Sequence, residues 1–216
     1  MRLADVAPGH WLTGLDTAQT ALVAAEGQAA TLRPLTGKAK SDRYGRVMGE
    51  VVLKATETSL RDALVADGLA FVNPTVMSEP CLNPLLVVER SAENRGKGLW
   101  AHGGVVRSAD APDLAADAGR FVMVRGRVLS VGETQRSVYL NFGEIYSTDF
   151  TALIAVKDAK GWPGGIAGVK AMAGEEVRIR GYLEAWNGGL IRVEHRAQIE
   201  ALSHDAASKG TPAASR

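Results

Sequence analysis

Apolar residues recur at helical spacing in three stretches of the first hundred residues. In residues 15–26 they occupy positions 15, 18, 22, 23 and 25, which predicts a helix. Ser59, with Asp62 three residues later, resembles a capping box and opens an apolar run that predicts a helix stopped by Gly68. A third helix is predicted over residues 85–94, where it is closed by the glycines of RGKGLW.

Short runs rich in β-branched residues predict strands in both halves of the chain. Two are predicted at residues 29–35 and 44–54, separated by a polar, basic loop. The second half carries five more, with a glycine-rich stretch of helical character at 161–173 between the third and the fourth. These five strands are 120–131, 137–142, 150–156, 175–184 and 190–194. Five strands with a helix after the third follow the order of the oligonucleotide-binding barrel.

The chain is long enough for two small domains, each with its own modest core. Residues 101–119 turn into Gly, Ala, Asp, Ser and Pro without periodicity, which is typical of a linker. We therefore predict a first domain at 1–104, a linker at 105–119, a barrel at 120–202 and a disordered tail at 203–216. The expected class is mainly β with helices (α+β): an incomplete barrel followed by a five-stranded one.

Three ordered segments carry a resemblance to a known family. They are DRYGRVMGEVVL at 42–53, SLRDALVADGLAFV at 59–72 and ERSAENRGKGLW at 89–100. Their order and spacing resemble the C-terminal half of the staphylococcal nuclease family. Upstream, RLADVAP at 2–8 resembles the family strand that supplies an arginine and two acidic residues to the active site. The family barrel has five strands, and this chain begins at about the third of them.

The resemblance implies phosphodiester hydrolysis with one Ca²⁺, a cation that prefers carboxylate ligands. Arg2 and Arg46 match the two family arginines that neutralise phosphoryl charge. The chain departs from the family at residues 7–10 (APGH), where the family has two acids. Asp5 is the one weak candidate left for a metal ligand. Two arginines without carboxylates bind phosphate but cannot act as a base.

Basic and aromatic residues predict contacts with nucleic acid in both domains. In the first, the basic loop beside the DRYGR turn borders the place where the family binds its polynucleotide; its residues are Lys38, Lys40, Arg43 and Tyr44. In the second, arginines recur at period two on two strands and are expected on a solvent face; they are Arg125, Arg127, Arg178 and Arg180. Aromatics on or near the second and third strands are candidates for base stacking, namely Tyr139, Phe142, Tyr146 and Phe150. Alternation places Phe142 on the core face with Val138 and Leu140.

The formal charge of +1, from 25 Lys and Arg against 24 Asp and Glu, provides no net attraction to a polyanion. Any contact with nucleic acid must therefore be local. No apolar run of 18 residues occurs, so no membrane span is expected. The location would be cytoplasmic if Met1 is the true start, and exported if a signal peptide is missing upstream.

Three functions remain open on the sequence alone. The first is a nuclease-family protein that binds single-stranded nucleic acid or a protein partner without hydrolysis and without a cofactor. The second is an active, Ca²⁺-dependent nuclease whose N-terminal catalytic strand is missing from this gene model. The third is a structural scaffold with no contact to nucleic acid.

Overall fold

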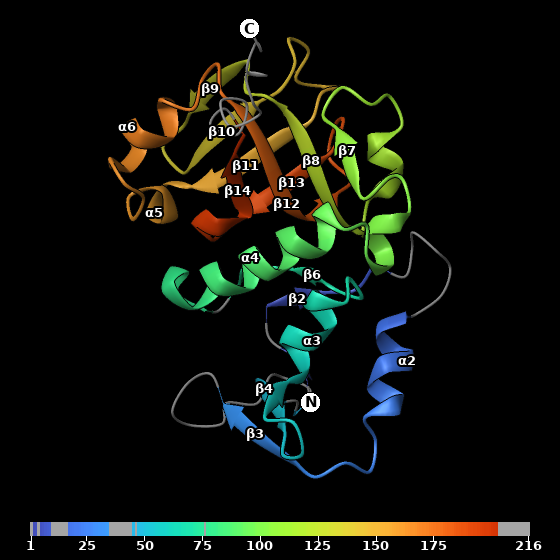
Figure 1. The fold of residues 1–216 in the computed structure, drawn as a ribbon. Coiled ribbons are helices and arrows are strands. Elements are labelled where there is room, and N and C mark those ends of the chain that lie inside the picture. Colours follow the sequence, from blue (N-terminus) through green and yellow to red (C-terminus); the bar gives the residue numbers. More distant parts are fainter. Residues whose placement is uncertain are drawn as a thin grey trace, which may run out of the picture. The chain divides into compact units, whose positions relative to one another are not determined.

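The computed structural model describes residues 2–3, 5–9, 17–34, 45, 47–75 and 77–202 (Figure 1). The chain divides into two compact units, Met1–Val105 and Val106–Arg216. Both combine strands with short helices, which confirms the α+β class. None of the described helices is long and apolar enough to cross a membrane. The predicted tail at 203–216 lies outside the described residues.

The first unit is built around one central strand, β4 (Met48–Leu53). On one side β4 pairs in parallel with β1 (Arg2–Leu3), and on the other it pairs antiparallel with β3 (Ala30–Pro34). The remaining strands are β5 (Thr58–Ser59), which pairs with β4, and a separate pair, β2 (Val6–Ala7) and β6 (Phe71–Val72). The helices are α2 (Thr17–Ala24), α3 (Leu60–Ala66), α4 (Glu79–Asn94) and the 3-10 helix η1 (Gly98–Ala101).

The helix predicted to begin at Ser59 is confirmed as α3, and the side chain of Ser59 accepts a hydrogen bond from the Asp62 N–H at 3.4 Å. Helix α4, in contrast, begins six residues before its predicted start at residue 85. The residues before 85 were not predicted as helical because they contain two prolines, which are typical of loops. Pro80 lies at the helix start, where no N–H is needed, and Pro84 removes one hydrogen bond to the carbonyl of Pro80 without ending the helix.

Two glycines from separate motifs meet backbone to backbone in the first unit. The Leu99 N–H donates to the Gly68 carbonyl at 2.8 Å. A Cβ on Gly68 would lie 2.2 Å from the Lys97 carbonyl oxygen, and one on Gly98 would lie 2.5 Å from that of Asp67. Beside this contact the Trp100 ring packs edge-on against Phe71 with ring centroids 5.2 Å apart. The segments SLRDALVADGLAFV and ERSAENRGKGLW are therefore parts of one core.

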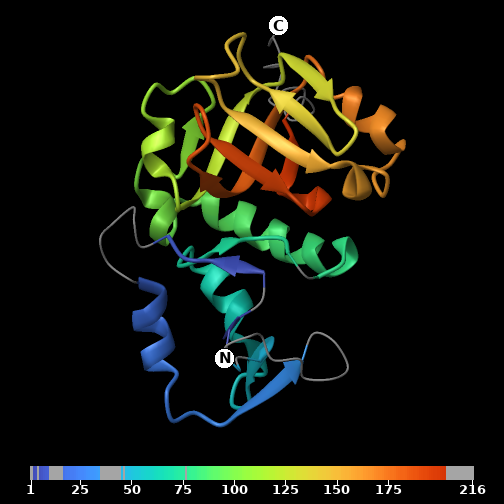
Figure 2. The same ribbon diagram turned by 180° about the vertical axis from the view of Figure 1, so that it is seen from behind.

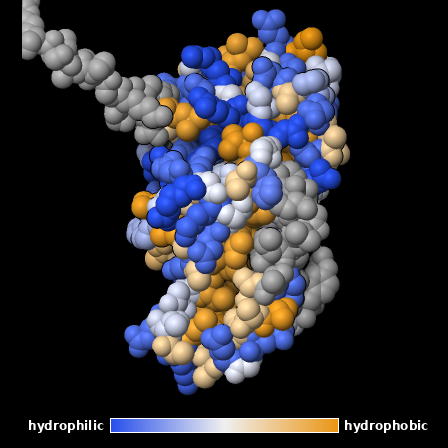
Figure 3. Space-filling view, turned by 45° about the vertical axis from the view of Figure 1, so that its right-hand side comes forward, coloured by the Kyte–Doolittle hydropathy of each residue, from blue (hydrophilic) through white to orange (hydrophobic). Residues whose placement is uncertain are grey.

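A small apolar hollow lies on the surface of the first unit, between α2 and α3. It has a volume of about 210 Å³ and is lined mainly by alanine and leucine side chains, among them Ala21, Ala63 and Leu64. Figure 3 shows apolar side chains gathered on this unit. Every residue of β3 is exposed, and β3 ends the described part of the sheet.

The second unit is a barrel with short helices attached, seen from opposite sides in Figures 1 and 2. Its strands are β7 (Val106–Ser108), β8 (Phe121–Arg127), β9 (Ser130–Glu133), β10 (Ser137–Asn141), β11 (Thr151–Ala155), β12 (Glu176–Glu184), β13 (Leu190–Val193) and β14 (Ile199–Ala201). Its helices are η2 (Leu114–Asp117), α5 (Val156–Ala159), α6 (Gly165–Lys170) and η3 (Arg196–Gln198).

The strands of the second unit follow one continuous path through the sheet. The sheet runs β8, β12, β13, β11, β10, β9, and β8 continues through two residues into β9, so the path returns to its beginning. Strands β11 and β13 are parallel, whereas the other neighbours along this path are antiparallel. The interior is filled by fully buried aliphatic side chains, including Val124, Leu140, Ile154 and Ile179. The alternation that predicted these strands thus also marks the core.

The segment predicted as a linker, residues 105–119, is instead folded onto the barrel. Strand β7 pairs in parallel with β8, with Val106 opposite Met123. Helix η2 follows, and Arg107 forms ion pairs with Asp113 and Asp117. The composition was misleading because a three-residue strand and a single 3-10 turn are too short to produce a visible periodicity.

Candidate nucleic-acid interface

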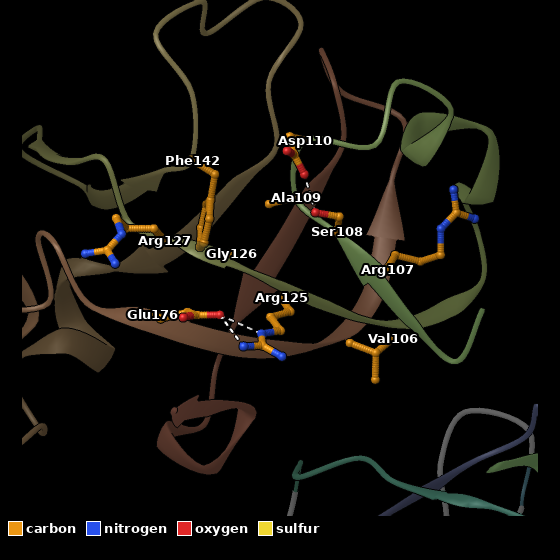
Figure 4. Close-up of a pocket in the computed structure, with 10 residues that line it drawn as sticks. All are labelled: Val106, Arg107, Ser108, Ala109, Asp110, Arg125, Gly126, Arg127, Phe142 and Glu176. Carbon is orange, nitrogen blue, oxygen red and sulfur yellow. Dashed lines mark hydrogen bonds and ion pairs between the residues drawn. The ribbon is translucent and has the colours of Figure 1, made fainter. Parts of the chain in front are cut away.

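A pocket of the second unit opens where β7, β8 and the end of β10 meet. Its volume is about 590 Å³, within the range of roughly 300–1,000 Å³ typical of small-ligand sites. Figure 4 shows Phe142 and Arg127 on one side of the pocket and Ala109, Ser108 and Asp110 on another, whereas the side chain of Arg125 points away from Phe142 toward Glu176. The pocket therefore combines one aromatic ring with cationic and anionic side chains.

Gly126 forms the floor of the pocket. A Cβ at this position would lie 2.6 Å from the Cβ of Ala109 and 2.9 Å from Cδ1 of Phe142. The ring of Phe142 also packs against Phe150, with centroids 5.0 Å apart. Alternation predicted that Phe142 shares the core face with Val138 and Leu140, but Phe142 is only partly buried. The ring of Phe142 therefore packs against the buried Phe150 and also lines the pocket.

The two arginines of β8 lie on either side of Gly126 along the strand, and both are exposed. Arg125 donates from Nε and Nη2 to one oxygen of Glu176, at 2.6 Å each, and its side chain is 58% exposed. Arg127 donates from Nη1 to the Gly174 carbonyl at 2.7 Å. A guanidinium has five N–H donors, so these contacts use only part of its capacity. An exposed pair such as Arg125 with Glu176 contributes about 0–1 kcal/mol, so it restrains the side chain of Arg125 only weakly.

Two further charged residues border the pocket without facing its centre. Arg107 points away from Phe142 in Figure 4, toward its acidic partners in and before η2. Asp110 is exposed and accepts a hydrogen bond from the Ser108 hydroxyl, which, with its own backbone N–H, lowers the pKa of Asp110. Asp110 therefore stays ionised near neutral pH, and it limits how much negative charge can approach from its side.

The other two arginines of the predicted groove do not face solvent. Arg178 lies opposite Arg125 on β12, but it is buried and forms an ion pair with Glu200 at 2.7 Å. Arg180 is 2% exposed, and its Nη2 lies 3.7 Å from the same carboxylate. The prediction of a four-arginine solvent face is therefore wrong. Period two placed these residues on one face of the strand, but it could not show that Glu200, from β14, meets them there.

The predicted site in the first unit falls mostly on residues that the structure does not describe: Lys38, Lys40, Arg43, Tyr44 and Arg46. Their roles stay predictions. The backbone of Arg2 is described, and it pairs in parallel with Met48 at the start of β4. This pairing brings the strand of Arg2 beside the one that begins two residues after Arg46.

The carboxylate of Asp5, the candidate metal ligand, accepts hydrogen bonds within the first unit. The side chain of Asp5 is buried, and its backbone has a φ of 55°. The carboxylate accepts hydrogen bonds from the Thr75 N–H at 2.6 Å, the Thr75 hydroxyl at 3.1 Å and the Met77 N–H at 3.2 Å. Within the described residues, no group of three or more His, Cys, Asp or Glu side chains is arranged to hold a metal ion.

The contributions of Gly126 and Ala109 to the pocket were not predicted from the sequence. One signal was present, because a glycine inside a strand often marks the close approach of another segment. The identity of that segment could not be read, because the pairing of β7 with β8 joins residues that are 17 positions apart, such as Val106 and Met123.

The comparisons with known proteins bear on the first unit. The family model described as "Staphylococcal nuclease homologue" matches residues 18–102. This range contains the two motifs whose glycines meet, together with β4 and helices α3 and α4. The chain therefore contains a staphylococcal-nuclease-like domain, as its motifs indicated. A search of the curated proteins found no match.

Proposed function

We propose that this nuclease-related protein binds single-stranded nucleic acid in the pocket of its second barrel and does not hydrolyse it. The observation that carries the proposal is the position of Arg125 and Arg127 on either side of Gly126, beside the ring of Phe142. Guanidinium groups bind phosphates with several donors at once, and an aromatic ring that solvent can reach stacks on a base.

Single strands fit this arrangement better than duplexes. The face of an aromatic ring can stack only on a base that is not already stacked between two others, and each such stack contributes about 1–3 kcal/mol. The backbone of the same strand would lie toward the two arginines. With a formal charge of only +1 on the whole chain, the affinity is expected to be about micromolar or weaker and to fall with added salt.

The absence of hydrolysis is proposed from the first unit. The chain has APGH at 7–10 where the resemblance expects two acids, and the carboxylate of Asp5 already accepts three hydrogen bonds. An arginine stays protonated near neutral pH and cannot activate water. If Arg2 and Arg46 contact phosphate, they do so as additional binding groups.

Charge reversal at the pocket is the direct test of binding. Arg125→Glu and Arg127→Glu are each expected to weaken binding of a fluorescent single-stranded oligonucleotide about tenfold, because each removes a charged hydrogen bond and adds repulsion. Arg95→Glu changes the net charge equally on an exposed residue of the first unit, and it should leave the affinity nearly unchanged. Equal effects of all three variants in fluorescence anisotropy would show that the pocket is not the site.

A further inference from the structure

Two loops of the second unit lie side by side at one end of the barrel. Residues 143–149 lead into β11, and residues 185–189 lead into β13. These two strands are parallel neighbours, so the loops that precede them are at the same end. The Thr151 N–H donates to the Gly189 carbonyl at 3.0 Å. A Cβ on Gly188 would lie 1.8 Å from the Thr148 carbonyl oxygen, so the two backbones are in direct contact.

Each of these loops exposes a large aromatic side chain. Tyr146 is 76% exposed and Trp186 is 46% exposed, and Ile145 beside Tyr146 is 60% exposed. We call these three residues the aromatic rim. Exposed single apolar residues are common, whereas exposed aromatic residues on two touching loops are a feature of interaction sites.

The loops hold the rim in place by internal hydrogen bonds. In the first, the Asp149 carboxylate accepts from the Ile145 N–H at 2.6 Å, and the Asp149 N–H donates back to the Ile145 carbonyl at 3.0 Å. In the second, the Gly189 N–H donates to the Trp186 carbonyl at 2.9 Å. Rings presented from ordered turns lose little conformational entropy when a partner binds.

The charge around the rim selects among partners. The first loop carries Glu144 and Asp149, and neither loop contains Lys, Arg or His. At their base, Glu184 and Arg192 form a mutual ion pair at 2.7 Å, which adds no net charge. Carboxylates repel phosphates but attract cations, and the faces of tyrosine and tryptophan attract them as well. This chemistry differs from that of the Arg125 and Arg127 pocket.

We propose that the aromatic rim binds an arginine- or lysine-rich segment of a partner protein. The cationic side chains of that segment stack on Tyr146 and Trp186, and Glu144 neutralises their charge. The inference is independent of nucleic-acid binding, because it uses neither arginine of the pocket. A nucleic acid bound at the rim is the competing outcome.

The test uses the full chain and two labelled eight-residue peptides, one alternating arginine with glycine and one alternating glutamate with glycine. The arginine peptide should bind, and Trp186→Ala and Tyr146→Ala should each weaken it about fivefold. Glu144→Gln should weaken it less, and in a salt-dependent manner. Matched controls are Leu129→Ala, which removes a side chain that is 50% exposed elsewhere on the barrel, and Glu57→Gln in the first unit. Both controls should bind like the unmodified protein.

Three results would overturn the inference. One is no binding of the arginine peptide by the unmodified protein. The second is equal weakening by the rim variants and their controls, which would indicate diffuse electrostatic attraction. The third is a loss of oligonucleotide binding in Trp186→Ala while peptide binding is unchanged. Arg125→Glu should leave the peptide affinity intact, so failure at the rim can be separated from failure at the pocket.

Discussion

Gly98→Ala is expected to destabilise the first unit by about 3 kcal/mol, a large part of the stability of a small domain. The φ of Gly98 is 53°, a conformation that costs an alanine about 1–2 kcal/mol. The added methyl group would also lie 2.5 Å from the Asp67 carbonyl and 2.6 Å from that of Gly68. Relieving this overlap means separating two backbone segments that share a hydrogen bond, at a further cost of about 1–3 kcal/mol. The shift in urea midpoint measures the total.

Gly96→Ala is the matched control, two residues earlier in the same motif. Its φ of 59° is nearly the same, but a Cβ there would meet no atom within 4 Å. Gly96→Ala therefore keeps the cost of a positive φ but avoids the steric overlap. The free energy of unfolding is expected to fall by only about 1 kcal/mol. Equal losses for the two variants would contradict the close contact between Gly98 and Gly68.

Glu89→Ala is expected to cost about 3 kcal/mol for a different reason. Glu89 is 1% exposed on α4, and its Oε1 accepts a hydrogen bond from the Val72 N–H of β6 at 2.7 Å. Removing the side chain takes away this acceptor within the core and leaves a cavity, and both effects oppose folding. Chemical denaturation of the full chain measures the change.

Two companion variants isolate the role of this hydrogen bond. Glu89→Gln keeps an oxygen that can accept from Val72, so we expect a loss of about 1 kcal/mol. Glu93→Ala, one turn later on the partly exposed side of α4, should cost less than about 1 kcal/mol. If Glu89→Gln were as damaging as Glu89→Ala, the acceptor would not be the feature that matters.

The sequence predicted the elements with strong periodicity and the helical stretch between the third and fourth predicted strands of the second unit. Alternation was sufficient for β8, β10 and β11, because their interior positions are occupied by buried aliphatic residues such as Val124, Leu140 and Ile154. The start of α4 was missed because proline is both a helix-start residue and a loop residue, and only the fold decides which role it takes.

The candidate site was predictable only in part. Arg125 and Arg127 were identified from their period-two spacing, and they do line a pocket. The same spacing included Arg178 and Arg180, which are buried beside Glu200. A strand pattern gives the face of a residue, but it does not show what another segment places on that face. For the same reason, the contribution of β7 and Ala109 to the pocket had no signal in the sequence.

One experiment tests both the proposed binding of single-stranded nucleic acid and the proposed absence of cleavage. An end-labelled oligonucleotide is titrated with the protein in Ca²⁺ at several salt concentrations, and the same samples are then resolved on a denaturing gel. We expect intact oligonucleotide throughout, and a binding constant whose logarithm falls with the logarithm of salt concentration with a slope of roughly 1.4, for two phosphate contacts. Cleavage that requires Ca²⁺ and disappears in Arg46→Ala protein would contradict the account, as would binding that ignores both salt and the charge of Arg125 and Arg127.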